Sequence, residues 1–152
     1  MRTPGMKKPG RRTDALVQSI DIYPTLAKLC GLTPPNDING KNFLDLLNNP
    51  SLPGPEYALS YNQSYGPPFR GKPRMYAVTL RSRVFRYIQW QKDLAEGEIL
   101  FRELYDHRSD ADETNNLATR ESKVIKHFEK ILREHLDLVF SKSPVQRMQF
   151  RK

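Results

Sequence analysis

The chain has 152 residues, of which 38% are hydrophobic and 28% are charged, a length that suffices for one compact domain with its own core. Nine of its 25 basic side chains lie in residues 1–12 and 141–152, which contain no acidic residue, so the formal net charge of +8 belongs to the two ends. The single cysteine, Cys30, excludes an internal disulfide framework, and no apolar run is long enough for a membrane span or an N-terminal signal peptide.

The first predicted helix lies within residues 19–32. Pro24 suits its first turn, where a backbone N–H has no partner, and Ser19 or Asp21 can cap that turn. Gly31 provides a left-handed end. The apolar side chains that share one face are Ile22, Leu26 and Leu29. This pattern predicts a short, buried, amphipathic helix.

The segments around this helix are predicted to be mostly irregular. Residues 1–12 contain prolines and glycines and form a lead-in, followed by a short extended piece at 15–17. After a loop and the Asn-Gly turn signal at 39–40, residues 43–47 predict a second short helix. The Pro-Gly-Pro sequence at 53–55 then marks a subdomain boundary.

Beyond this boundary the hydrophobic pattern changes from helical spacing to alternation. Four strands rich in β-branched and aromatic residues are predicted, at 57–61, 75–80, 84–90 and 99–105. An antiparallel sheet of these strands has one apolar face that needs a cover. A helix from about residue 122 to 139 supplies it, with apolar residues at helical spacing: Val124, Ile125, Phe128, Ile131, Leu132, Leu136 and Val139.

These elements predict an α+β fold, with short helices followed by a four-stranded antiparallel sheet covered by a C-terminal helix. We divide the chain into residues 1–52, residues 53–140 with the sheet and its helix, and a basic tail at 141–152. Basic ends can bind nucleic acid, so a stand-alone module that binds nucleic acid or another polyanion is the alternative interpretation of the whole chain.

Two groups of residues are of the types that bind metal ions, but the spacing within each group does not fit a metal site. The three histidines are spread too widely for a single ion: His107, His127 and His135. The acidic run at residues 106–113 alternates as a calcium loop does, but it lacks the glycine and glutamate that an EF-hand needs at its sixth and twelfth positions. Aspartates also cap turns through their own backbone, and this interpretation is favoured. The sequence predicts no metal site.

Four short motifs occur in the same order as in the sulfatases, which the chain resembles. Residues 21–31 match D-x-x-P-T-L-x-x-x-x-G. Residues 39–47, N-G-K-N-F-L-D-L-L, resemble D-G-x-S-L-x-x-L-L, and residues 81–90, R-S-R-V-F-R-Y-I-Q-W, resemble R-T-x-x-Y-R-Y-x-x-W. Residues 103–118 resemble E-L-Y-D-x-x-x-D-P-x-E-x-x-N-L-A. Ala111 replaces the proline of the last one. Together they cover roughly residues 13–120, which is far more specific than any one motif. The form of the third motif, together with residues 40–42 and the loop at 60–67, is most similar to the iduronate-2-sulfatase-like branch.

The resemblance implies an alkaline-phosphatase-like fold and a secreted, periplasmic or lysosomal parent enzyme. That parent would hydrolyse sulfate esters with a formylglycine nucleophile and a divalent cation, calcium. Formylglycine forms from the cysteine or serine of C/S-x-P-x-R. Cys30 lacks both the proline and the arginine, and residues 51–55 lack the arginine. The family's metal ligands and catalytic residues lie upstream of the matched motifs, so no catalytic or metal-binding residue carries over and the chain itself needs no cofactor.

The resemblance identifies the chain as a C-terminal sulfatase fragment: a truncated product, a split-gene half or a processed piece. Residues 1–52 then form the edge of an incomplete catalytic domain, and the chain alone is expected to be inactive. The implied partner is an upstream catalytic half, with no membrane involved, and nucleic acid remains the partner of the alternative interpretation only. Without that half, Ile20, Ile22, Leu26 and Leu29 are expected to leave an apolar helix face partly uncovered.

One basic region could contact the sulfated sugar on which such a parent acts. Residues 70–86 contain six basic side chains and no acidic one, interleaved with aromatic residues. Arginine presents a planar fork to sulfate or carboxylate oxygens, and aromatic faces stack on sugar rings. The candidate substrate-binding residues are Tyr65, Arg70, Arg74 and Arg81. The alternative is a solvated strand face with core aromatics.

Overall fold

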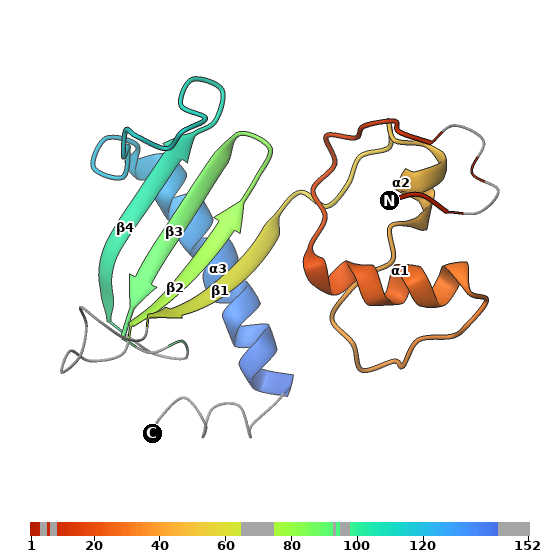
Figure 1. Ribbon diagram of the computed structural model, residues 1–152. Coiled ribbons are helices and arrows are strands. Elements are labelled where there is room, and N and C mark those ends of the chain that lie inside the picture. The colour runs from red at the N-terminus through yellow and green to blue at the C-terminus, as the bar shows by residue number, and fades with distance from the viewer. Residues whose placement is uncertain (4–5, 7–8, 65–74, 93, 95–97, 143–152) are drawn as a thin grey trace. The chain divides into compact units, whose positions relative to one another are not determined.

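The computed structural model describes residues 1–142 apart from residues 4–5, 7–8, 65–74, 93 and 95–97, and side chains as far as residue 137. The chain divides into two compact units, Met1–Ala58 and Leu59–Lys152. Its elements are η1 (Ser19–Asp21), α1 (Ile22–Leu29), α2 (Leu44–Asn48), β1 (Ala58–Ser64), β2 (Met75–Arg81), β3 (Phe85–Gln91), β4 (Ile99–Asp106) and α3 (Ser122–Lys142) (Figure 1). None of the described helices is long and apolar enough to cross a membrane.

In the first unit, buried polar side chains join α1 to the segment before α2. The Asp21 carboxylate accepts hydrogen bonds from the backbone N–H of Gln18 at 2.9 Å and of Lys41 at 2.8 Å. The Thr25 hydroxyl donates to the Asp21 carbonyl at 2.6 Å and accepts from the Phe43 N–H at 3.0 Å. Asp21 and Thr25 are both buried, so these bonds fix the two segments together with little competition from water. The first sulfatase-like motif therefore has a structural role.

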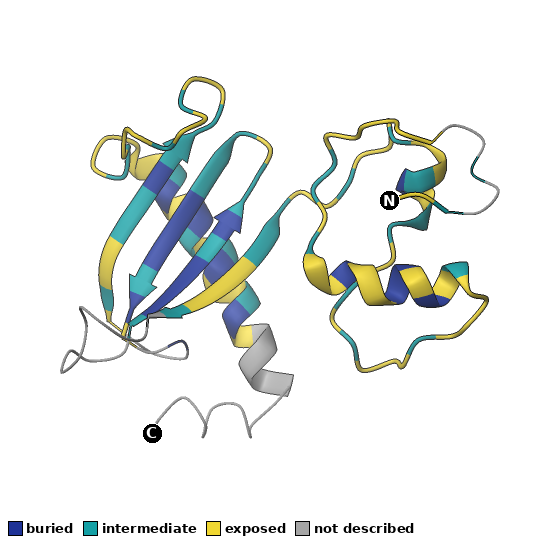
Figure 2. Cartoon of the chain, in the orientation of Figure 1, coloured by how far each residue is buried: buried dark blue, intermediate teal, exposed yellow. Residues whose placement is uncertain are grey.

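The buried face of α1 is not the apolar face that its sequence predicts. Pro24, Thr25 and Ala27 are buried, whereas Ile22 is 45% and Leu26 47% exposed (Figure 2). The prediction of a buried apolar face is thus wrong for these residues, because the helix is held through Thr25 and the adjacent Asp21. The expectation of an uncovered apolar face is confirmed for Ile20, Ile22 and Leu26, while Leu29 is half-buried.

The expected cap of α1 also needs correction. Asp21 does not cap α1 with its side chain, since its carboxylate turns back to the Gln18 N–H and forms a capping box on η1. The left-handed end at Gly31, with φ of 71°, is confirmed.

The second unit contains the predicted four-stranded antiparallel sheet, in the order β1-β2-β3-β4. Ser82 closes the tight turn between β2 and β3, because its hydroxyl accepts from the Phe85 N–H at 2.8 Å. In the resulting register Arg81 lies opposite Arg86, which in turn lies opposite Tyr105. The sheet, the turn and the C-terminal helix agree with the sequence prediction.

Helix α3 covers one face of this sheet and forms the main core with it (Figure 1). The Phe128 ring stacks on Tyr87, with centroids 5.8 Å apart, and meets Phe85 edge-on at 6.3 Å. Phe128 is 2% exposed and Leu132 is fully buried. Their predicted burial is confirmed, whereas Ile131 is half-buried. The fully buried residues of the sheet are Val78, Leu80, Tyr87 and Leu104.

The Asn116 side chain occupies part of the outer edge of β4. Its Oδ1 accepts from the Leu104 N–H at 3.0 Å and its Nδ2 donates to the Arg102 carbonyl at 3.1 Å. The Leu117 N–H also donates to the Leu104 carbonyl, at 2.8 Å. An amide that both accepts and donates in this way replaces the peptide group of a neighbouring strand, which protects an exposed edge from pairing with another chain. This explains the asparagine of the fourth motif.

Replacing Asn116 with alanine should lower the free energy of unfolding by about 1 kcal/mol, since two hydrogen bonds to β4 are lost at a partly solvated edge. Urea denaturation of the chain measures this. Asn115→Ala is the matched control, because only the backbone of Asn115 takes part in the described bonds. Equal losses in the two variants would contradict the assigned role of Asn116.

Candidate functional site

The face of the sheet that α3 does not cover carries a row of polar and aromatic side chains. Phe85 and Tyr87 contact α3, so the alternate residues of β3 point to the opposite face. The register extends this face to the two neighbouring strands. We call it the open face, and its residues are Ala77, Thr79 and Arg81 of β2, Arg86, Ile88 and Trp90 of β3, and Phe101, Glu103 and Tyr105 of β4.

At one end of the open face two arginines lie directly opposite each other. Like charges in that position repel, and a carboxylate from the loop after β4 offsets the repulsion. Glu113 Oε2 lies 2.6 Å from Arg86 Nη1, and Glu113 Oε1 lies 2.6 Å from His107 Nε2. Burial raises the pKa of Glu113. The hydrogen bonds from Arg86 and His107 lower this pKa by more than burial raises it, so the net shift is downward. Glu113 is therefore an ionised partner for Arg86.

The backbone of Glu113 adopts a conformation that non-glycine residues rarely use. Its φ is 56°, and it is the one non-glycine residue with positive φ among those the structure describes. This left-handed conformation costs roughly 1 kcal/mol or more for a residue with a side chain. The bonds of its carboxylate to Arg86 and His107 help to hold it there. Glu113 thus combines charged contacts to Arg86 and His107 with a strained backbone.

Arg81 is the incompletely bonded member of this group. Its Nη1 is buried, and within the described part of the chain it has no hydrogen-bond acceptor. Burial lowers the pKa of Arg81, the charge of Glu113 opposes that shift, and the charge of Arg86 adds to it. A buried N–H without an acceptor costs about 1–3 kcal/mol. An acceptor oxygen bound at this position would therefore satisfy the unpaired N–H and remove that cost.

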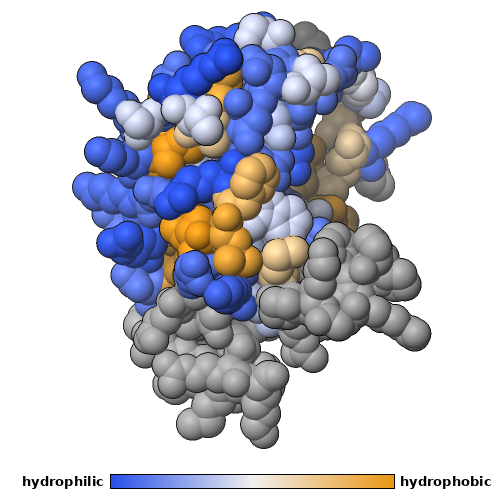
Figure 3. Space-filling model, turned by 90° about the vertical axis from the view of Figure 1, so that its left-hand side faces the viewer, coloured by the Kyte–Doolittle hydropathy of each residue, from blue (hydrophilic) through white to orange (hydrophobic). Residues whose placement is uncertain are grey.

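Further along the open face a carboxylate holds two aromatic side chains. Trp90 Nε1 donates to Glu103 Oε1 at 2.6 Å, and the Tyr105 hydroxyl donates to Glu103 Oε2 at 2.6 Å. The bond to Glu103, with some burial, raises the pKa of Tyr105 to about 12, so its hydroxyl stays protonated. Phe101 lies opposite Trp90 and is 55% exposed. Leu100 and Phe101 are the exposed large apolar residues of β4. On the side of the molecule that Figure 3 presents, apolar side chains lie among hydrophilic ones.

The structure describes one of the four predicted substrate-binding residues. Tyr65, Arg70 and Arg74 lie outside the described residues, and Arg81 lies on the open face beside Arg86. Sequence reasoning did not assign a role to Glu113, His107, Trp90 or Glu103. The alternation within β3 could have placed Arg86 and Trp90 on one face, but nothing in the pattern connects Glu113 with Arg86, 27 residues away.

The acidic run after β4 organises its loop, as the sequence favours. Asp110 accepts hydrogen bonds from the backbone N–H groups of Thr114 at 2.9 Å and Asn115 at 3.0 Å. These bonds lower the pKa of Asp110. In the part of the chain with described side chains, no group of three or more histidine, cysteine, aspartate or glutamate residues could hold a metal ion.

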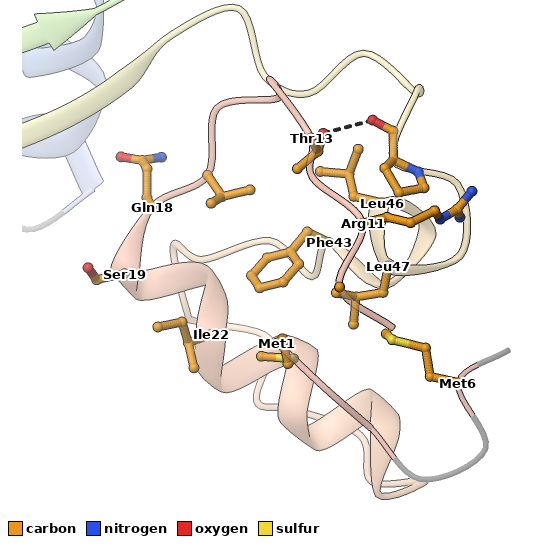
Figure 4. Close-up of a pocket in the computed structure, with 13 residues that line it drawn as sticks. Met1, Met6, Arg11, Thr13, Gln18, Ser19, Ile22, Phe43, Leu46 and Leu47 are labelled. Atoms are coloured by element: carbon orange, nitrogen blue, oxygen red, sulfur yellow. Dashed lines mark hydrogen bonds between the residues drawn. The ribbon is translucent and has the colours of Figure 1, made fainter. Parts of the chain in front are cut away.

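The first unit contains an apolar cavity of about 450 Å³ between its lead-in, α1 and α2 (Figure 4). Ile22 and Phe43 line it, with Leu46, Leu47 and Met1. One wall is fixed by a hydrogen bond from the Thr13 hydroxyl to the Pro50 carbonyl, at 2.8 Å. This lining suits an apolar side chain, and it contains no pair of nucleophile and base. The cavity adjoins the uncovered face of α1 through Ile22, which belongs to both.

Residues 1–140 match the family model described as "N-sulphoglucosamine sulphohydrolase, C-terminal". The chain is 25% identical over 131 residues to arylsulfatase K of Xenopus laevis, an alignment that covers 85% of this chain and 24% of that protein. It is 27% identical over 119 residues to N-acetylglucosamine-6-O-sulfatase of Bacteroides thetaiotaomicron, covering 77% of this chain and 20% of that protein. The chain thus spans a quarter or less of the length of these relatives.

The fold resembles a part of solved sulfatase structures. A structure of a putative sulfatase from Bacteroides thetaiotaomicron superposes with a TM-score of 0.61 at 23% sequence identity, over 76% of this chain and 24% of that one. Because the sequence identity is below 25%, this similarity shows a shared fold and nothing more. It agrees with the antiparallel sheet and C-terminal helix described above.

Proposed function

The chain belongs to the N-sulphoglucosamine sulphohydrolase C-terminal family, and from this premise we propose that it is the C-terminal part of a sulfatase, a sulfuric ester hydrolase that acts on sulfated sugars. The match of residues 1–140 to the family carries this proposal. The two named relatives, both sulfatases, support it. Within the family we propose a specificity like that of the iduronate-2-sulfatases, on the form of the hairpin motif at residues 81–90.

The nucleophile and the cation of such an enzyme belong, in this proposal, to a catalytic half outside these 152 residues. Family members use a formylglycine and a divalent cation, for which we propose calcium. Cys30 is exposed and lacks the sequence context for conversion to formylglycine. Among the described side chains, no group of three or more histidine, cysteine, aspartate or glutamate residues could hold a cation. We therefore assign packing and substrate contact, but no step of the hydrolysis, to this chain.

The uncovered face of α1 supports the proposed partner, a sulfatase catalytic half. Ile20 is 53%, Ile22 45% and Leu26 47% exposed, and an apolar cavity adjoins them. Apolar surface of this kind marks a missing protein contact. In this proposal residues 1–52 complete the edge of the catalytic domain, residues 53–140 form the sheet subdomain, and residues 141–152 are a basic tail.

The substrate contact that we propose for this chain involves Tyr65, Arg70, Arg74 and Arg81. A guanidinium binds sulfate or carboxylate oxygens through two parallel N–H bonds, and a tyrosine ring can stack on a sugar. The buried Arg81 Nη1, which lacks an acceptor among the described residues, supports a role for Arg81 toward an anion.

The purified chain should release no sulfate from N-acetylglucosamine-6-O-sulfate or an aryl sulfate, with or without added calcium. The reason is that neither a formylglycine motif nor a described cation site is present. Ion chromatography of released sulfate measures this, with the Bacteroides thetaiotaomicron relative as the positive control. Metal-dependent release that copurifies with the chain through successive columns would overturn the proposal of a separate catalytic half.

A further inference from the structure

The open face combines two arginines at one end with aromatic side chains at the other. We propose that it binds a sulfated oligosaccharide, with Arg81 and Arg86 holding one sulfate or carboxylate group and Trp90 and Phe101 supporting a sugar ring. The class of ligand rests on the proposed function. The site adds Arg86, Trp90 and Phe101 to the contacts proposed above, and assigns Glu113 the role of an internal competitor.

The charges at the arginine end favour an added anion. Arg81 and Arg86 face each other across β2 and β3, and Glu113 is the carboxylate bonded to Arg86. One carboxylate thus balances two guanidinium groups, and the Nη1 of Arg81 lacks an acceptor among the described residues. A sulfate group has enough oxygens to bond both guanidinium groups at once.

Glu113 is positioned to yield to such an anion. Its carboxylate bonds Arg86 at 2.6 Å, and its charge acts on Arg81 as well. Its backbone is held in the left-handed region, at a φ of 56°. When a sulfate takes over the bonds to the arginines, the Glu113 side chain can leave and its backbone can relax. A sulfate in this place would also lie near Arg81, whose Nη1 is buried and lacks an acceptor among the described residues.

The aromatic end is suited to a sugar ring. The Trp90 indole N–H and the Tyr105 hydroxyl both donate hydrogen bonds to Glu103. These bonds hold the two rings at their edges and leave the ring faces available for other contacts. Phe101, opposite Trp90, is 55% exposed, whereas Leu104 of the same strand is fully buried. Arg86 and Trp90 point the same way four residues apart, which is about 13 Å along the strand. That span requires a disaccharide or a longer chain.

Binding to the full 152-residue chain tests this site by isothermal titration at constant ionic strength. The probes are sodium sulfate, an N-sulfated glucosamine–uronate disaccharide and the same disaccharide without sulfate. We expect the sulfated disaccharide to bind more tightly than sulfate, and the unsulfated one to bind weakest. Arg81→Gln should weaken binding of sulfate and of the sulfated disaccharide by about tenfold or more, the loss typical of a hydrogen bond to a charged group. Glu113→Gln should strengthen both.

Two matched controls distinguish binding at this site from general effects of losing a positive charge or an exposed apolar side chain. Arg83→Gln removes the same charge from the exposed turn beside the open face, and should change the affinity much less than Arg81→Gln. Phe101→Ser should weaken binding of the disaccharide but not of inorganic sulfate, whereas Leu52→Ser, at an exposed apolar residue of the first unit, should change neither. A cooperative melting transition and a wild-type circular dichroism spectrum establish that each variant is folded.

The inference is overturned if Arg81→Gln and Arg83→Gln weaken binding equally, if Glu113→Gln weakens it, or if the unsulfated disaccharide binds as tightly as the sulfated one. Sugar binding that none of the open-face variants alters would also overturn it, because the sugar would then bind elsewhere on the chain. These outcomes are independent of turnover. A parent enzyme that hydrolyses no sulfate ester would refute the proposed function and leave the measured binding site standing.

Discussion

Replacing Phe128 with alanine should lower the free energy of unfolding of the sheet unit by ~3–5 kcal/mol. Phe128 is 2% exposed and its ring contacts Tyr87 and Phe85 on the covered face of the sheet. Truncation removes this buried surface and leaves a cavity between α3 and β3. Because small domains have total stabilities of roughly 5–15 kcal/mol, the loss is large enough to leave the unit marginally folded.

Urea denaturation followed by the fluorescence of Trp90 measures this loss, since the single tryptophan lies in β3 of the same unit. Phe101→Ala is the control, because it makes the same substitution at a phenylalanine that is 55% exposed on β4. It should change stability by less than about 0.5 kcal/mol. If both variants lost the same small amount, α3 would not form the core of this unit.

Replacing Gly40 with alanine should destabilise the first unit by about 1–3 kcal/mol or more. A Cβ atom at this position would collide with the backbone carbonyl of Ile20, in the turn that precedes α1. The backbone would have to separate there, which would also pull on the bond between Asp21 and the Lys41 N–H. The effect should be confined to the first unit.

Hydrogen exchange resolved along the sequence distinguishes the two units in this variant. The Gly40→Ala chain should lose protection in α1 and around residues 40–48, while β2, β3 and β4 keep theirs. Asn39→Ala, at the exposed neighbour of Gly40, should leave both units unchanged. Unaltered protection of α1 in the Gly40→Ala chain would show that this close approach is unimportant.

Patterns of hydrophobicity predicted the second unit well. The helical spacing around Phe128 and Leu132, and the alternation in the strands, each correspond to one buried face against one partner. The first unit was harder because its helix is fixed by Asp21 and Thr25, which no hydrophobic pattern marks as buried. Gly40 similarly resembles a turn residue, whereas its main constraint is the approach of the Ile20 backbone.

The candidate site was partly accessible to sequence reasoning. A run of arginines without acids is visible by inspection, and it includes Arg81 and Arg86. Their pairing across the sheet follows only from the register, which the Ser82 turn sets. The contact of Glu113 with Arg86 joins residues 27 apart and depends on how the loop after β4 folds back. Long-range contacts of this kind leave no local periodicity to detect.

The most direct test of the account exchanges this chain for the equivalent part of a relative. In N-acetylglucosamine-6-O-sulfatase of Bacteroides thetaiotaomicron, the segment that aligns with this chain is replaced by it, and sulfate release is compared with that of the same enzyme lacking the segment. We expect the chimera to release sulfate at a measurable rate and the truncated enzyme to release none. A chimera as inactive or as insoluble as the truncated enzyme would contradict the claim that this chain is a sulfatase C-terminal part.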